Sequence, residues 1–256
     1  MDDHDMSINA YRDLVGEPSD TVPAILATGR SDITTLFVSM SRKHEQGHDA
    51  DYLRWHSLDH RPEQQRLASI RTSTRLVSTP QCRAARAADA DSHSAVDHVM
   101  IYFFAGQEGL GEFYDLGLAL HEAGRSPFIM PPVERGVYTL GEVVAEPRIR
   151  TGADVLPWLP IRGMYLLVEQ GGEAAPLPQG IPGVAGALTS SSVASEISSV
   201  APGQHLTLCF LDQDPIEVAR TIEPYLRERW SDTSLTPLLA APYFSIVAYE
   251  WDRYLP

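Results

Sequence analysis

The stretch AVDHVMIYFFAG, residues 95–106, is apolar on both of the faces that an extended chain presents. Such a run is typical of a strand in the middle of a sheet, where both faces are covered. Alternating or β-branched runs lie on either side of it, at 34–43 (TTLFVSMSRK), 69–79 (SIRTSTRLVST) and 133–146 (VERGVYTLGEVVAE). These patterns predict four strands in the first half of the chain.

Two helices are predicted between these strands. The first lies in the segment DYLRWHSLDHRPEQQRL, residues 51–67, and is expected to end near Arg61, because Pro62 disfavours helical geometry in the residue before it. The second spans 109–125, where apolar residues recur at helical spacing. The resulting βαββαβ order is that of the ferredoxin-like split unit and predicts an α+β protein.

The second half shows the same order without its first helix. Strands are predicted at 162–172, 183–195, 204–214 and 242–254, and Pro215 opens a helix before the last of them. The proline-rich stretch EAAPLPQGIP lies where the first helix would be. The chain is therefore divided into an N-terminal arm (1–31), a first repeat (32–150) and a degenerate second repeat (151–256). Two such sheets packed face to face would form a barrel-like sandwich with a pocket inside.

Composition limits the function classes. The 256 residues carry a formal net charge of −14, which disfavours nucleic-acid binding, since phosphate contacts need clustered Lys and Arg. Cys82 and Cys209 are the two cysteines, and they form neither a disulfide framework nor a metal-ligand spacing, so a reducing cytoplasmic compartment is expected.

The acidic start is unlike a signal peptide, and no apolar run approaches ~18 residues, so no membrane partner is expected. No phosphate-binding fingerprint occurs, and we expect no cofactor.

The first predicted helix resembles a known family. An aromatic residue is followed three positions later by another, then by a histidine, and then by a proline two residues further on: Tyr52, Trp55, His60 and Pro62. This series is similar to that of the EthD-like branch of the dimeric α/β-barrel superfamily, in which a tryptophan often stands where this chain has His56. The resemblance covers residues 34–146 and implies a pocket between the sheet and its helices. The superfamily includes cofactor-free monooxygenases, isomerases, cyclases and haem proteins, so the fold alone does not settle the function.

His56 and His60 are four residues apart and share one helical face. A zinc site of this spacing would need a third ligand, and no metal site is expected. An acid–base site needs a neutral imidazole that faces a pocket, and His60 is the candidate general base. His98 and Tyr102 share one face of the third strand and could converge on it. The alternative is that both are core residues with satisfied hydrogen bonds.

Further candidates would bind the substrate. Arg71 and Arg75, on one face of the second strand, could hold a carboxylate or phenolate, unless that face is simply exposed. Tyr138 could donate to a developing enolate, and Tyr52 and Trp55 are expected to line the pocket.

The predicted function is that of a cofactor-independent lyase-, isomerase- or cyclase-like enzyme acting on a hydrophobic, carbonyl- or phenol-bearing small molecule. The alternative is a non-catalytic protein that binds a small hydrophobic or anionic ligand in the same pocket. A haem-binding function is a third possibility, which the missing helix of the second half weakens. A homodimer is possible.

Overall fold

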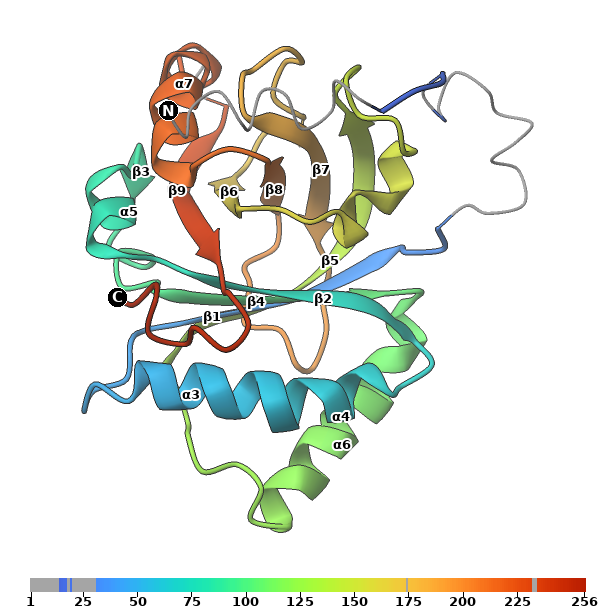
Figure 1. Cartoon of the computed structure of the whole chain (residues 1–256), viewed down its shortest axis with the longest axis vertical. Helices are drawn as coiled ribbons and strands as arrows, with labels where there is room; N and C mark the ends of the chain where they lie inside the picture. The colour runs from blue at the N-terminus through green and yellow to red at the C-terminus, as the bar shows by residue number, and fades with distance from the viewer. Residues whose placement is uncertain (1–13, 18, 20–30, 174, 232–233) are drawn as a thin grey trace.

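The computed structural model describes residues 14–17, 19, 31–173, 175–231 and 234–256. The arm expected at 1–31 lies largely outside the described residues. The described chain is an α+β structure built on an eight-stranded antiparallel barrel, with few helices (Figure 1).

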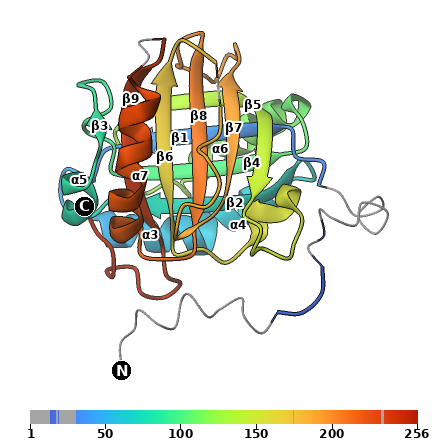
Figure 2. The same cartoon turned by 90° about the horizontal axis from the view of Figure 1, so that it is seen from above.

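Each half supplies four strands to the barrel. The first half contributes β1 (Thr35–Ser41), β2 (Ile70–Val77), β4 (His98–Phe104) and β5 (Pro132–Ala145), in the order β2-β4-β1-β5. The second half contributes β6 (Gly163–Gln170), β7 (Val184–Ser192), β8 (Gln204–Leu211) and β9 (Thr236–Ser245), in the order β7-β8-β6-β9. When the strands are counted within each half, the two orders are the same. In Figure 2 the strands β6, β7 and β8 run across β1 and β2.

The barrel closes within one chain. The halves are joined at one seam by pairing of β5 with β7 and at the other by a short pairing of β2 with β9, where Leu76 lies opposite Ser245 and Val77 opposite Phe244. A two-residue strand, β3 (Ala88–Asp89), pairs with the other edge of β9. The connector between β2 and β3 carries the short helix α5 (Pro80–Ala84).

The helices cover the outside of the barrel. A continuous helical segment, α3 (Asp49–Trp55), η2 (His56–His60) and α4 (Arg61–Gln65), lies with α6 (Leu110–Glu122) beneath the sheet of β1, β2 and β4, whereas α7 (Pro215–Arg229) lies against the second sheet (Figure 1). Two short 3-10 turns, η3 (Gln107–Gly109) and η4 (Ala153–Trp158), complete the described helical structure.

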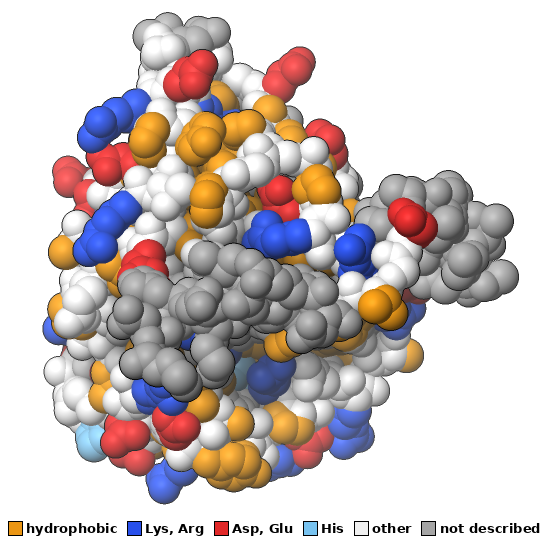
Figure 3. Space-filling model, turned by 45° about the horizontal axis from the view of Figure 1, so that its top comes forward, with side chains coloured by type: hydrophobic (Ala, Val, Ile, Leu, Met, Phe, Trp, Pro, Cys, Tyr) orange, Lys and Arg blue, Asp and Glu red, His pale blue; other side chains and the backbone are white. Residues whose placement is uncertain are grey.

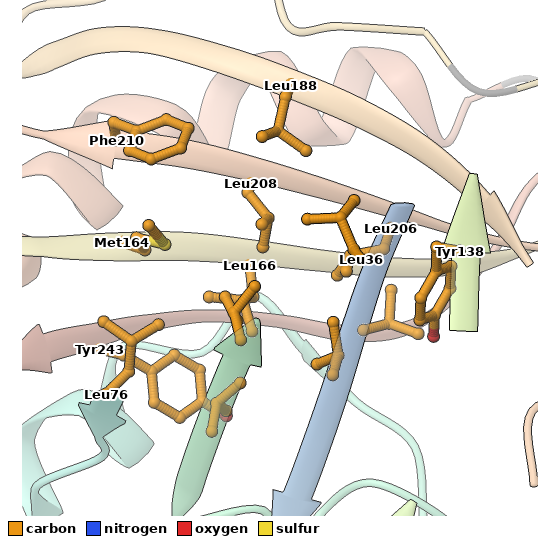
Figure 4. Packing of buried hydrophobic residues seen from close by; sticks show 14 of the residues in the cluster. Leu36, Leu76, Tyr138, Met164, Leu166, Leu188, Leu206, Leu208, Phe210 and Tyr243 are labelled. Carbon is orange, nitrogen blue, oxygen red and sulfur yellow. The ribbon is translucent and has the colours of Figure 1, made fainter. Parts of the chain in front are cut away.

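The inside of the barrel is filled by side chains. Leu36 and Leu76 of the first sheet meet Leu166, Leu208 and Tyr243 of the second, and all are fully buried (Figure 4). The expectation of a pocket inside the sandwich was therefore wrong. Both faces of the central strands are apolar, and the sequence did not show which face would meet the other sheet.

The first helix continues past the position where the sequence predicted its end. The helical segment runs to Gln65 through a π turn, in which the backbone N–H of Arg61 donates to the carbonyl of His56, five residues earlier. A wide turn accommodates a proline, which lacks an N–H and would otherwise crowd the carbonyl four residues before it. Arg61 also donates to Ser73 Oγ at 2.8 Å and holds this part of the helix on β2.

The last strand lies earlier than predicted. It spans Thr236–Ser245 instead of 242–254, although it contains Pro237 and Pro242. Pro237 lies where the register with β6 shifts, and a proline is tolerated at such an irregularity. The following segment turns back, with Tyr249 at φ 67° and Tyr254 stacked on Phe244 at 4.1 Å between ring centroids.

Candidate functional site

A cavity of about 810 Å³ lies between the helical segment α3–α4, α6 and the outer face of the first sheet. Its size falls within the range of small-molecule sites. The apolar part of its wall is mostly aromatic and comes from β1, α3, β4, α6 and the α6–β5 connection: Phe37, Trp55, Met100, Phe113, Phe128 and Met130. The cavity thus lies where the resemblance implied a pocket, on the side of the sheet that faces the helices.

Two imidazoles project from the helical segment into this cavity. His56 and His60 both line it, and their ring centroids are 5.5 Å apart. The Nδ1 atoms of both rings are buried and have no hydrogen-bond partner in the described part of the chain. Burial, together with the positive charge of Arg75, lowers the pKa of His60 to about 4 and holds the pKa of His56 well below its usual value. Both rings are therefore neutral at pH 7, which is the form that accepts a proton.

Arg75 lies on the floor of the cavity and is 4% exposed. One terminal nitrogen donates to Tyr52 Oη at 2.7 Å, and the guanidinium carbon lies 5.0 Å from the centroid of the Tyr52 ring. The Nε atom has no partner, and no ion pair of Arg75 is found among the described residues. A buried cation beside an apolar cavity favours an anion there.

Tyr102 also faces the cavity, and its hydroxyl donates to the Gln64 side-chain carbonyl. Burial raises the pKa of Tyr102 well above its ordinary value, so it remains a protonated donor. The sequence reasoning missed Gln64, because it placed the end of the helix before this residue. Its position four residues after His60 is a spacing that would have placed it on the same face.

His98 lies near the cavity but does not line it. The ring is fully buried, and Nε2 contacts Asp49 Oδ1 at 2.8 Å. Burial lowers its pKa in spite of the carboxylate. Asp49 also accepts from the backbone N–H of His44 at 2.9 Å. The pair joins the start of α3 to β4. His98 is therefore a core histidine that is bonded at Nε2, although its buried Nδ1 has no partner among the described residues. The expected convergence of His98 with Tyr102 and His60 is therefore only partly found.

Arg71 and Arg75 do not share a face. The pairing of β2 with β4 shifts register between Ile70 and Thr72, and this bulge turns Arg71 away from the cavity. Arg71 instead pairs with Asp32, with two contacts of 2.6 Å. The expectation of two guanidiniums side by side was wrong, because a bulge changes the alternation of side chains and was not visible in the sequence.

Tyr138 lies inside the barrel instead of in the cavity (Figure 4). Its ring is fully buried, and its hydroxyl accepts from Gln204 Nε2 at 3.0 Å. The expectation that Tyr138 would face the substrate pocket was wrong. Both Gly136 and Tyr138 point to the inner face of β5, and the side chain of Val137 is the one that faces the helices.

The helical segment α3–α4 and the end of α6, which flank the cavity, are joined by hydrogen bonds of Arg125. Arg125, just beyond α6, donates to Asp59 at 3.0 Å and to Glu63 at 2.9 Å, and its carbonyl accepts from Trp55 Nε1 at 3.0 Å. Asp59 is thus engaged by Arg125, and it does not orient His60.

The mouth of the cavity is formed by parts of both halves. On one side lie Tyr114 and Leu118 of α6 and Ile129, three exposed apolar side chains. On the other lies the β7–β8 connection, residues 193–203, which runs beside β5 and donates from the Ser199 N–H to the Arg135 carbonyl at 2.7 Å. Residues 196–199 of this connection line the cavity. No sequence signal had assigned this loop to the site.

The described residues contain no group of three His, Cys, Asp or Glu side chains that could hold a metal ion. His56 and His60 together lack a third ligand. Both cysteines are buried and unpaired, and burial raises the pKa of Cys209 to about 12 and that of Cys82 above its usual value. Neither thiol has the lowered pKa of a nucleophile.

The face drawn in Figure 3 has no concentration of basic side chains, because its Lys and Arg residues are scattered among acidic and apolar ones. None of the described helices combines the length and the apolar composition that crossing a membrane would need.

Comparisons with known proteins place the fold. No protein-family model matches the sequence, and no curated protein does. Among solved structures, a candidate chlorite dismutase, TA0507, matches with a TM-score of 0.52 at 12% identity, over 86% of this chain and 97% of that one. An anthrone oxidase-like protein matches with a TM-score of 0.46 at 9% identity (85% and 92% covered). A candidate monooxygenase from Lactobacillus acidophilus NCFM matches with 0.40 at 8% (84% and 99%). The match to the candidate chlorite dismutase shows a likeness of fold alone, an α+β barrel that spans most of both chains.

Proposed function

We propose that the chain is a cofactor-independent enzyme that transfers a proton on a hydrophobic, carbonyl- or phenol-bearing small molecule, in a lyase-, isomerase- or cyclase-like reaction. The observation that carries this proposal is the pair of neutral imidazoles of His56 and His60 that line a cavity of about 810 Å³. A neutral imidazole that faces a pocket is the form that can accept a proton from a bound molecule.

His60 is the general base in this proposal. It is less buried than His56, and it lies over Trp55 with 5.1 Å between ring centroids. Tyr102 supplies a hydroxyl donor for an oxyanion or enolate that develops on the substrate, when its hydrogen turns from Gln64 Oε1 to that oxygen. Tyr52, Trp55 and Arg75 contact the bound molecule. His98, Arg71 and Tyr138 have no part, because none of them lines the cavity.

The proposal includes the finer description of the fold. Residues 32–150 and 151–256 are two ferredoxin-like repeats, the second without its first helix, in an EthD-like chain. The identical strand orders of the two halves support this division. Three members of the aromatic and histidine series, Tyr52, Trp55 and His60, line the cavity, which supports the EthD-like assignment.

A base in an apolar cavity can be tested with 5-nitrobenzisoxazole. The imidazole takes the proton from C3 of this ring, the N–O bond breaks, and the electron pair leaves as a coloured cyanonitrophenolate. We expect the protein to accelerate this reaction and His60→Gln to lower the rate by about 10²-fold, the usual contribution of a positioned base. His205→Gln on β8, outside the cavity, is the matched control. An equal rate in the parent protein and in His60→Gln would contradict the proposal.

A non-catalytic ligand-binding protein is the second candidate. It is favoured by the absence, among the described residues, of a carboxylate that orients either imidazole: Asp59 is bound by Arg125, and Asp49 by His98. Saturable binding of 5-nitrobenzisoxazole without any acceleration would favour this candidate over the enzyme.

A further inference from the structure

Four buried or partly buried arginines differ in how their charge is balanced. Arg229 forms two contacts with Glu169, at 2.7 and 2.8 Å, and Arg83, whose side chain is 37% exposed, is paired with the fully buried Asp97. Arg86 donates to two backbone carbonyls of the loop before β4 and lies 3.7 Å from Asp89 Oδ2, although its Nε has no partner among the described residues. Arg75, which is 4% exposed, has one neutral partner, the hydroxyl of Tyr52, and an Nε with none.

Among the described residues, no carboxylate forms an ion pair with Arg75. Burial, together with the charge of Arg75, lowers the pKa values of His56, His60 and His98, so these three imidazoles are neutral at pH 7. The face of the Tyr52 ring gives the cation partial stabilisation. A buried charge without a counterion is unfavourable, and an anion that enters the cavity with its own apolar body would offset this cost.

The floor of the cavity indicates the shape of such an anion. Arg75 on β2 lies opposite Met100 on β4, Met100 opposite Ser39 on β1, and Ser39 opposite Arg135 on β5. At ~4.8 Å between neighbouring strands, this row of backbone positions extends ~14 Å from the buried Arg75 to the exposed Arg135. The walls above it are aromatic, since Phe113 lies 4.9 Å from Tyr102 and 5.2 Å from Phe37 between ring centroids.

We propose that the cavity selects flat aromatic molecules that carry one acidic oxygen group, a carboxylate or a phenolate, and that the guanidinium of Arg75 binds this group. The ring system lies along Met100 and Ser39 beneath Phe113, and its far edge points to the mouth near Arg135. This inference rests on the proposed function for the location of the site and adds the substrate class. Planar two-point hydrogen bonding to an oxygen pair is what a guanidinium provides and an ammonium does not.

The test uses a matched pair of ligands, 2-naphthoate and its neutral amide, 2-naphthamide. Their binding is measured at pH 7 by isothermal titration calorimetry. We expect the parent protein to bind the naphthoate at least tenfold more tightly than the amide. Arg75→Met should abolish this preference and keep the affinity for the amide. Arg71→Met, four residues earlier on the same strand and outside the cavity, should leave the preference unchanged.

Arg75→Lys guards against an Arg75→Met variant that does not fold. It retains a positive charge and removes the planar guanidinium, so the preference for naphthoate should fall below tenfold. Survival of the full preference in Arg75→Lys or in a folded Arg75→Met would overturn the inference.

The failure of this inference is distinguishable from that of the proposed function. Equal binding of the two ligands, with benzisoxazole turnover still dependent on His60, would reject the anion site and leave the enzyme proposal standing. Binding of neither ligand would overturn the inference that this cavity takes aromatic anions.

Discussion

The two sheets have the same strand order, but the layers between each sheet and its helices differ: one is filled by side chains and the other contains a cavity. In the second half, Tyr165 and Leu167 of β6 pack with Cys209 of β8 against Ile222 and Leu226 of α7, and the interface is fully buried. In the first half, the corresponding layer between the sheet and α3–α4 holds the cavity with its imidazoles and its unpaired guanidinium. We call the second half closed, because α7 packs directly on its sheet, and the first half open, because a cavity separates its sheet from its helices.

The difference follows from a few residue types. On β1 the positions that face the helices are Phe37, Ser39 and Ser41, so two small polar side chains stand where β6 offers larger ones. In the second half the proline-rich connection places Leu177 and Ile181 in the same cluster as α7, where the first half has the helix that carries His56 and His60. The cavity is therefore present because the first half lacks part of the apolar packing that the second half has.

The charges repeat this contrast. Glu169 and Arg229 neutralise each other beneath α7, and Trp230 Nε1 donates to the same carboxylate at 2.8 Å. Arg75 has no such partner among the described residues. In the closed half the charges of Glu169 and Arg229 are paired with each other. In the open half the charge of Arg75 has no ion-pair partner among the described residues, and in our proposal it binds a ligand.

The largest expected effect tests this contrast of charges. Glu169→Gln should lower the free energy of unfolding by about 3 kcal/mol or more, because it leaves the guanidinium of Arg229 buried without its counterion. Arg75→Met should change the same quantity by less than about 1 kcal/mol, since it removes a charge that has no counterion. Urea denaturation of both variants measures the difference. A larger loss in Arg75→Met than in Glu169→Gln would contradict the account.

Packing should show the same asymmetry. Leu226→Ala on α7 removes a fully buried side chain and should cost about 2–5 kcal/mol in the free energy of unfolding. Leu118→Ala on α6, at the mouth of the cavity, removes a side chain that is 45% exposed and should cost less than about 0.5 kcal/mol. Thermal and urea unfolding give both values, and equal losses would show that α6 is packed as tightly as α7.

The imidazoles of the open half should make stability depend on pH. The pKa of His60 is about 4 in the folded protein and lies near 6.5 when unfolded, so between these values the unfolded chain binds more protons. Stability is therefore full above about pH 6.5 and falls as the pH drops toward 4. His60→Gln should reduce this fall by about 2–3 kcal/mol at most, and His205→Gln should not. An unchanged pH profile in His60→Gln would show that the ring is exposed to water.

The smallest effect on stability is expected when a larger apolar side chain is placed on the cavity floor of the first half, as on the sheet of the second half. Ser39→Leu puts a larger apolar side chain on the floor of the cavity, and we expect the free energy of unfolding to change by less than about 1 kcal/mol. Binding of 2-naphthamide, measured by calorimetry, should weaken by tenfold or more. Thr139→Leu, at an exposed position of β5, is the control. Unchanged binding in Ser39→Leu would place the ligand elsewhere.

The sequence predicted most of the strands and two of the helices well, because their apolar periodicity is local, whereas the last strand was placed too late. The runs around His98–Phe104 and Gly163–Gln170 agree with the structure to within a few residues, and Pro215 does open α7. The pattern failed where pairing between strands decides the outcome. The bulge before Thr72 separates Arg71 from Arg75, and only the partner strand reveals it.

Part of the candidate site could be predicted, because helical spacing is also a local property of the sequence. A four-residue spacing placed His56 and His60 on one face, and the resemblance of the helix added Tyr52 and Trp55, all of which line the cavity. Tyr138 was misplaced, because alternation tells which residues share a face of β5 and not which face is inside. Gln64 was missed because the helix was predicted to end before it, although its spacing from His60 is a local signal. The loop at 196–199 reaches the site from the other half of the chain and has no local signal.

The most direct test of the central claim is a crystal structure of the protein with 2-naphthoate. The account predicts one bound molecule beneath α6, with its carboxylate within hydrogen-bond distance of the Arg75 guanidinium, its rings against Phe113 and Trp55, and no ligand between α7 and the second sheet. A structure in which α6 closes onto Ser39 and fills the cavity, with the naphthoate bound elsewhere, would contradict it.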